Sequence, residues 1–180
     1  MCSPFRLARL TAAAVSTLAL MSCASLNVNS YVERGVNFTR YQTYSWGPGD
    51  SQSTGDPRLD SNPFFFERIQ ADVEKQLATR GFGKTTSGTP DLLIHLHASI
   101  NQRIDVNDAD REYSRCDGCR PFAYEAGTLL LDFVDTRTNK VVWRGWAEGS
   151  VDGVIDNQEW MEQKIDDAVT RILERFPRRL

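Results

Sequence analysis

The alternation of apolar and polar residues between Leu92 and Ile100 restricts the fold of this chain more than any other feature. Every second residue from Leu92 onward is aliphatic or Ala, whereas His95, His97 and Ser99 lie between them. Because successive side chains of a strand point to opposite faces, this pattern predicts a strand with one buried face. The chain must therefore form a sheet, and one face of that sheet must be covered.

Two amphipathic helices are predicted to supply the cover. The first begins at Asn62-Pro63, a capping residue followed by a proline suited to the first turn, and ends at Gly81. Its apolar residues recur every four positions and are Phe65, Ile69, Val73 and Leu77. The second helix opens with Asp156 and Glu159, which have the spacing of a capping box, and ends at Pro177.

The remaining apolar segments predict further strands. They begin at Tyr31 and cover residues 38–46, 122–134 and 140–151, and the last two are joined by a turn over 135–139. Residues 47–62 and 101–121 are predicted loops. This order of elements predicts an α+β fold, in which two helices pack on one face of a mainly antiparallel β-sheet. We expect a single domain over residues 31–180.

The N-terminal residues have the features of an export signal. Arg6 and Arg9 precede an apolar stretch over residues 10–21. The following residues, Leu20-Met21-Ser22-Cys23, resemble the bacterial lipobox, in which a diacylglyceryl group is attached to the cysteine thiol and a peptidase cleaves before it. The alternative is an ordinary secretory signal with an incidental Cys23.

Lipid on Cys23 would anchor the protein to a membrane. We expect a lipoprotein signal peptide over residues 1–22, and a lipidated N-terminus with a short tether over 23–30. Each buried methylene of a palmitate-type acyl chain contributes about 0.8 kcal/mol, so two or three chains give a stable anchor. Because Ala24 rather than Asp follows Cys23, the pattern in a Gram-negative cell favours the outer membrane, facing the periplasm. The lipid is the one covalent group that we expect, and we predict no other cofactor.

The charge of the chain argues against one class of partner. The formal charge is −3 for the whole chain, and loss of Arg6 and Arg9 with the signal makes it more negative. Nucleic-acid binding depends on neutralising phosphates with basic residues. We therefore predict no nucleic-acid partner.

Two cysteines remain able to pair after processing, since Cys2 leaves with the signal and Cys23 carries the lipid. In an exported domain Cys116 and Cys119 are predicted to form a disulfide. A redox pair is the alternative, because neighbouring arginines favour a thiolate. A zinc site with His95 and His97 is a further alternative, since a two-residue spacing on a strand places both histidines on one face. The alternative function is thus a metal- or redox-active periplasmic protein.

No residue pattern in the chain predicts catalysis. Asp132 and Asp135 lie near a strand end, where turn and capping roles are favoured over a glycosidase pair. Gly-x-Ser-x-Gly and phosphate-binding motifs are absent from the sequence. Trp143 and Trp146 are predicted to point to opposite faces of their strand, so that at least one belongs to the core. We expect that the protein is not an enzyme.

Several of these segments together resemble a known family. The most specific runs are Gly127-Thr128-Leu129 and Val142-Trp143-Arg144-Gly145, with Asp132 between them and Phe176-Pro177 at the end. In this order they resemble a bacterial lipoprotein family known as domain of unknown function 4136. The resemblance implies an envelope location and brings no activity. We therefore predict a binding or assembly module whose partner is an envelope protein or a glycan.

Overall fold

The computed structural model describes residues 26–48, 53–104 and 123–177. Six strands form one sheet, in the order β1-β6-β5-β4-β2-β3. The strands are β1 (Asn27–Val32), β2 (Thr43–Trp46), β3 (Gly83–Lys84), β4 (Leu92–Ile104), β5 (Ala123–Asp135) and β6 (Lys140–Ser150). The helical elements are η1 (Phe38–Arg40), α1 (Pro57–Asp60), α2 (Pro63–Thr79) and α4 (Gln158–Glu174).

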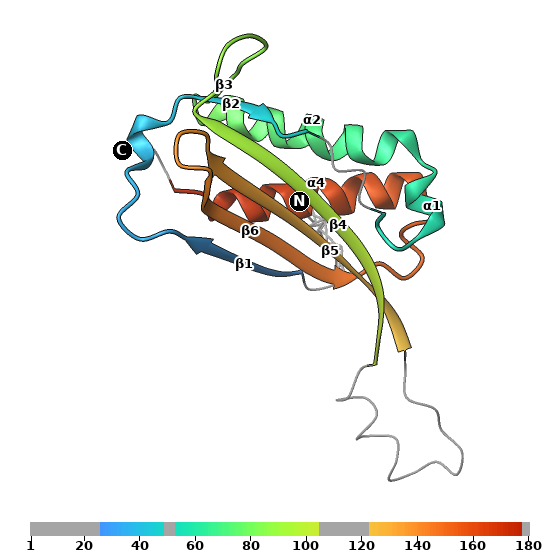
Figure 1. Cartoon of the computed structure of the whole chain (residues 1–180). Helices are drawn as coiled ribbons and strands as arrows, with labels where there is room; N and C mark the ends of the chain where they lie inside the picture. Colours follow the sequence, from blue (N-terminus) through green and yellow to red (C-terminus); the bar gives the residue numbers. More distant parts are fainter. Residues whose placement is uncertain (1–25, 49–52, 105–122, 178–180) are drawn as a thin grey trace, which may run out of the picture.

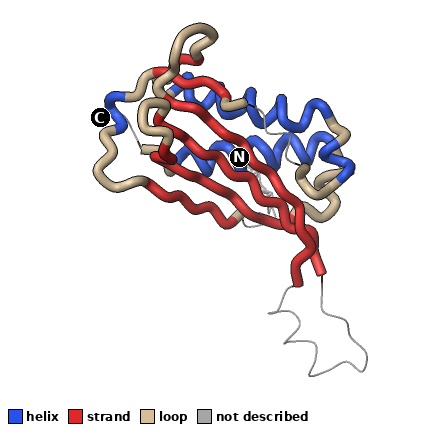
Figure 2. Tube along the Cα trace, viewed as in Figure 1, coloured by secondary structure: helices blue, strands red, loops and turns tan. Residues whose placement is uncertain are grey.

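The predicted α+β fold is confirmed. The pairs β1–β6, β6–β5 and β5–β4 are antiparallel, whereas β2 runs parallel to both β4 and β3. Both long helices lie on the same face of the sheet (Figures 1 and 2). Within the described ranges no helix is long and apolar enough to cross a bilayer.

The two long helices run parallel to each other. Arg68 Nη1 lies 3.5 Å from Glu162 Oε2, and Gln76 Nε2 donates to Thr170 Oγ1 at 3.0 Å, eight residues farther along each helix. Both helices therefore begin at one end of the sheet and finish at the other. The core consequently has an end built by helix N-termini and an end built by helix C-termini.

The capping box predicted for the last helix is wrong by one residue. Asn157 is the N-cap, and its side chain accepts from the Trp160 backbone N–H at 3.0 Å. Asp156 instead lies 3.0 Å from Arg58 Nη1, which joins this loop to α1. The prediction for α2 is confirmed, because the Asn62 side chain accepts from the backbone N–H of Phe64.

Other element boundaries also differ from the predictions. Residues 27–30, predicted to belong to the tether, are in β1 and pair with β6, because Val28 alternates into the core. The predicted strand over 38–46 begins as η1, whose first turn is capped by the Asn37 side chain. The predicted loop over 47–62 contains α1, and β4 runs on to Ile104 in a two-stranded ribbon with β5 (Figure 1).

Candidate functional site

The face of the sheet that α2 and α4 leave uncovered carries both histidines. In the strand register, residues on paired positions share a face, so two rows of side chains cross this surface. We call these rows the outer face. They are His95, Asp132, Arg144 and Tyr31, followed by His97, Leu130, Trp146 and Asn29.

A bidentate ion pair lies in the first row of the outer face. Arg144 Nε donates to Asp132 Oδ1 and Arg144 Nη2 donates to Asp132 Oδ2, both at 2.6 Å. The hydrogen bonds to Asp132 raise the pKa of the Arg144 guanidinium. The carboxylate is 8% exposed and the guanidinium side chain 44%. Asp132 therefore holds Arg144 in a fixed orientation, with part of the cation open to solvent.

A β-bulge decides which residues of β6 reach the outer face. Phe133 pairs with Trp143, but Val134 pairs with Val141, so that Val142 is the extra residue. Because one extra residue reverses the faces of all that follow, Trp143 points into the core and Arg144 points outward. The predicted placement of Trp143 and Trp146 on opposite faces is confirmed, since Trp143 is 0% exposed and Trp146 is half-buried.

The histidines occupy the edge of the outer face. The ring of His95 packs on Gly47, where an added Cβ would lie only 2.7 Å from Nδ1. Beside His95 and His97 the end of β2 leaves a groove of about 380 Å³, whose other walls include Trp46 and Phe66. The groove therefore continues the outer face around the edge of β4.

The zinc site proposed from the sequence has no further ligand among the described residues. Within those ranges no group of three His, Cys, Asp or Glu side chains could hold a metal ion. Cys116 and Cys119, and the predicted lipidation residue Cys23, lie outside the described residues.

The carboxylates considered for a glycosidase pair point to opposite faces. Asp135 accepts from Tyr41 Oη at 2.8 Å and from the backbone N–H of Arg137 at 2.8 Å, on the helix side of the sheet. Asp91 likewise accepts from the backbone N–H groups of Gln42 and Thr43, which holds β2 in place. The predicted turn role is confirmed for Asp135, which accepts from backbone N–H groups of the following turn, whereas Asp132 forms the ion pair on the outer face.

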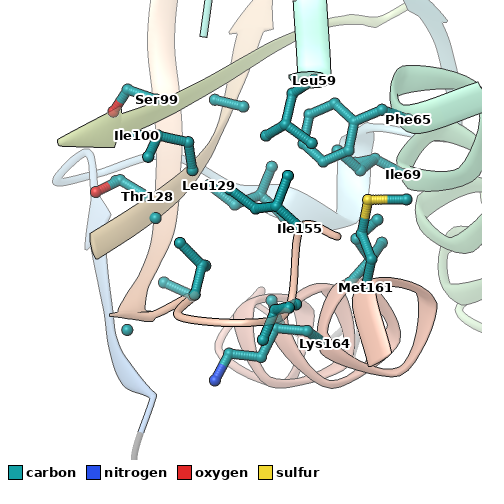
Figure 3. Close-up of a pocket in the computed structure, with 18 of the residues that line it drawn as sticks. Leu59, Phe65, Ile69, Ser99, Ile100, Thr128, Leu129, Ile155, Met161 and Lys164 are labelled. Carbon is teal, nitrogen blue, oxygen red and sulfur yellow. The ribbon is translucent and has the colours of Figure 1, made fainter. Parts of the chain in front are cut away.

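A second concave feature lies between the sheet and the N-terminal halves of the helices, and it is partly open to solvent. We call it the inner cavity; its volume is about 80 Å³. Its apolar walls include Leu26, Leu59, Phe65, Ile69, Leu129, Met161 and Ile165 (Figure 3). Lys164 supplies the one charged side chain of the lining, and burial lowers its pKa.

Small residues create the inner cavity. Ala98, Ala147 and Gly149 occupy sheet positions in its wall, and Ala168 faces them from α4. The sequence motifs of the family lie partly on these strands, but no periodicity in the sequence predicts a cavity. The Asp132–Arg144 pair was missed for another reason, since a hairpin without a bulge would pair Asp132 with Trp143.

The chain was compared with protein families, with curated proteins and with solved structures. The family described as domain of unknown function (DUF4136) matches residues 28–178. A search of curated proteins found no match.

Among solved structures, a PDZ domain protein from Parabacteroides distasonis is 15% identical with a TM-score of 0.53. The match covers 84% of this chain but only 36% of that protein, so this chain corresponds to about a third of its length. A variant PelC dodecamer from Paraburkholderia phytofirmans is 9% identical with a TM-score of 0.50, and the match covers 87% of this chain and 100% of PelC. A minor lipoprotein from Acinetobacter baumannii is 10% identical with a TM-score of 0.42, over 74% of this chain and 91% of that one.

Proposed function

Because the chain belongs to the DUF4136 family, whose description assigns no activity, we propose its function from its own residues: a membrane-anchored lipoprotein of the bacterial envelope that acts by binding or assembly. Cys23 in its lipobox supports the anchor. Only Ala24, Ser25 and Leu26 separate Cys23 from β1, a reach of at most about 14 Å. The domain is thus held against the lipid surface. In a Gram-negative cell this surface is the outer membrane, facing the periplasm.

The outer face is the binding surface in this proposal. It presents Trp146, Tyr31 and a guanidinium that Asp132 holds in place. Trp, Tyr and Arg are the residues that contribute most binding energy at protein interfaces, and aromatic rings also stack on sugars. We assign the outer face to an envelope protein or glycan. Binding there requires neither catalysis nor a cofactor beyond the lipid.

Assembly with further copies of the chain fits the same proposal. The structurally similar PelC from Paraburkholderia phytofirmans is a dodecamer. In this chain β1 is an edge strand, and its Tyr31 and Val32 are 52% and 42% exposed. Native mass spectrometry of the membrane-extracted protein measures the number of copies directly.

The anchor is tested by intact mass spectrometry of protein extracted from membranes. We expect the mature chain to begin at Cys23 and to carry the added mass of a diacylglyceryl group. Cys23→Ser should abolish that mass and release the protein from the membrane fraction. A wild-type chain without lipid would reject the anchor.

The assignment of the outer face as the binding surface is tested by substituting two tryptophans that lie on different layers. Trp146 lies on the outer face, whereas Trp160 is 53% exposed on α4. After cross-linking in intact cells, we expect Trp146→Ala to lower the recovery of the protein or glycan partner at least tenfold, while Trp160→Ala leaves it unchanged. Equal recovery with both variants would contradict the assignment.

A further inference from the structure

The inner cavity lies next to the point where the lipidated end of the chain enters the domain. Leu26 forms part of the cavity wall and packs on Gly149, where an added Cβ would lie 2.9 Å from Leu26 Cδ2. Cys23 is three positions earlier in the sequence. Three residues span at most about 11 Å, so a lipid on Cys23 is attached within that distance of the wall.

The chemistry of the inner cavity suits an acyl chain. Aliphatic and aromatic side chains surround the space, as the labelled residues show in Figure 3. A water-sized group needs about 10–15 Å³ in a cavity measured in this way. The 80 Å³ available is several times this minimum, which suits the end of an acyl chain rather than its whole length.

Two cations of α4 lie where the chain enters. The Lys164 stem lines the cavity, while its ammonium points away from the apolar side chains (Figure 3). Arg171 Nη2 donates to the Leu26 carbonyl at 3.1 Å and so fixes the entering backbone against α4. An ammonium at the rim can donate hydrogen bonds to ester carbonyls, the polar groups next to the acyl chains of a diacylglyceryl group.

We propose that one acyl chain of the lipid on Cys23 inserts its end into the inner cavity. This inference rests on the proposed lipidation. The short connection raises the effective concentration of that chain above that of free lipid. The remaining acyl chains stay in the bilayer, so the cavity end of the domain faces the membrane and the tether is shortened further.

The test is photo-cross-linking inside the cell that makes the lipoprotein. Cells are fed a palmitate analogue with a diazirine near its methyl end, illuminated, and the lipoprotein is digested and sequenced by mass spectrometry. We expect cross-links that join the Cys23 peptide to the β4 peptide around Ala98 or the α4 peptide around Ile165.

Cavity-filling variants provide the control. Ala98→Leu and Ala168→Leu each place a larger side chain in the cavity wall and should lower these cross-links at least tenfold. Ala78→Leu makes the same change at an exposed position of α2 and should leave them unchanged. Thermal unfolding of each variant verifies that it is folded.

Three results would overturn the inference, and they are distinguishable. If intact mass shows lipid on Cys23 but its acyl chains cross-link only to membrane lipids, the inference fails and the proposed function stands. If the cavity peptides carry acyl chains that are not attached to Cys23, the cavity binds free lipid instead. If Cys23 carries no lipid, the proposed anchor fails together with the inference.

Discussion

The two ends of the core differ in how completely they are packed. At the C-terminal end of the helices, Phe176 lies among aromatic rings, with centroids 4.7 Å from Phe133 and 5.0 Å from Trp143. Phe38 and Phe82 complete this aromatic end, each 5.6 Å from Phe176. At the N-terminal end, small side chains leave the inner cavity. One sheet and one helix pair thus support a filled and a hollow region.

This difference separates residues that maintain the fold from residues available for function. Interlocking aromatic rings have few alternative arrangements, so the aromatic end fixes the register of β5 against β6. At the inner cavity, larger side chains would bury more apolar surface than the small residues present. Stability should therefore depend strongly on substitutions at the aromatic end and weakly on substitutions that fill the cavity.

The largest effect is expected for Trp143→Ala. Trp143 is fully buried among the rings of the aromatic end, and removal of such a side chain costs about 3–5 kcal/mol in the free energy of unfolding. Trp146→Ala, the same change on the outer face of the same strand, should cost less than about 1 kcal/mol. Urea denaturation measures both. Similar losses for the two variants would contradict the placement of the tryptophans.

Gly145→Ala should destabilise the aromatic end next most strongly. An added Cβ would overlap the Trp143 ring and lie 2.7 Å from Ile172 Cγ2, and both of these side chains are fully buried. Overpacking of this kind costs about 3 kcal/mol, at the upper end of the usual range. Gly83→Ala in β3 is the matched control, because nothing lies within 4 Å of its added Cβ. Calorimetric melting of the two variants should differ; equal melting temperatures would exclude the clash.

Alkaline pH should also weaken the aromatic end, where the Tyr41 ring packs against Phe38 with centroids 5.8 Å apart. Burial and the hydrogen bond to Asp135 raise the pKa of Tyr41 to about 12. An unfolded tyrosine loses its proton near pH 10, so between about pH 10 and 12 the unfolded state binds fewer protons and stability falls with rising pH. The loss attributable to Tyr41 is about 2 kcal/mol at pH 12. In denaturation measured across that pH range, the Tyr41→Phe variant should lack this loss of stability. If the variant and the wild type lost stability equally with rising pH, the assignment to Tyr41 would be contradicted.

The smallest effect is expected at the hollow end. Ala98→Leu extends a side chain into the inner cavity, so added burial offsets local adjustment, and the free energy of unfolding should change by less than about 1 kcal/mol. Urea denaturation of the unlipidated Cys23→Ser chain, with and without this substitution, provides the measurement. A cost near that of Gly145→Ala would show that the cavity end is as tightly packed as the aromatic end.

Periodicity in the sequence predicted the layers of this fold. Leu92 and Ile94 are 0% and 1% exposed, as the alternation requires, and Ile69 and Leu77 on the stripe of α2 are 0% exposed. These patterns are local, because neighbouring residues of a strand or helix occupy known faces. Short elements were harder to predict from the sequence, because β1, η1 and α1 depend on caps and on pairing with distant partners.

The sequence by itself also predicted a lipobox at Cys23, and it predicted the family motif and the opposite faces of Trp143 and Trp146. Only the tertiary structure showed why that motif reads Val142-Trp143-Arg144-Gly145. Val142 is the bulge, Trp143 fills the core, Arg144 binds Asp132 and Gly145 leaves space for the indole ring. A one-residue shift between β5 and β6 reverses every side chain, and the packing of residues distant in sequence decides that shift. For the same reason, the outer face and the inner cavity exist only in the folded chain.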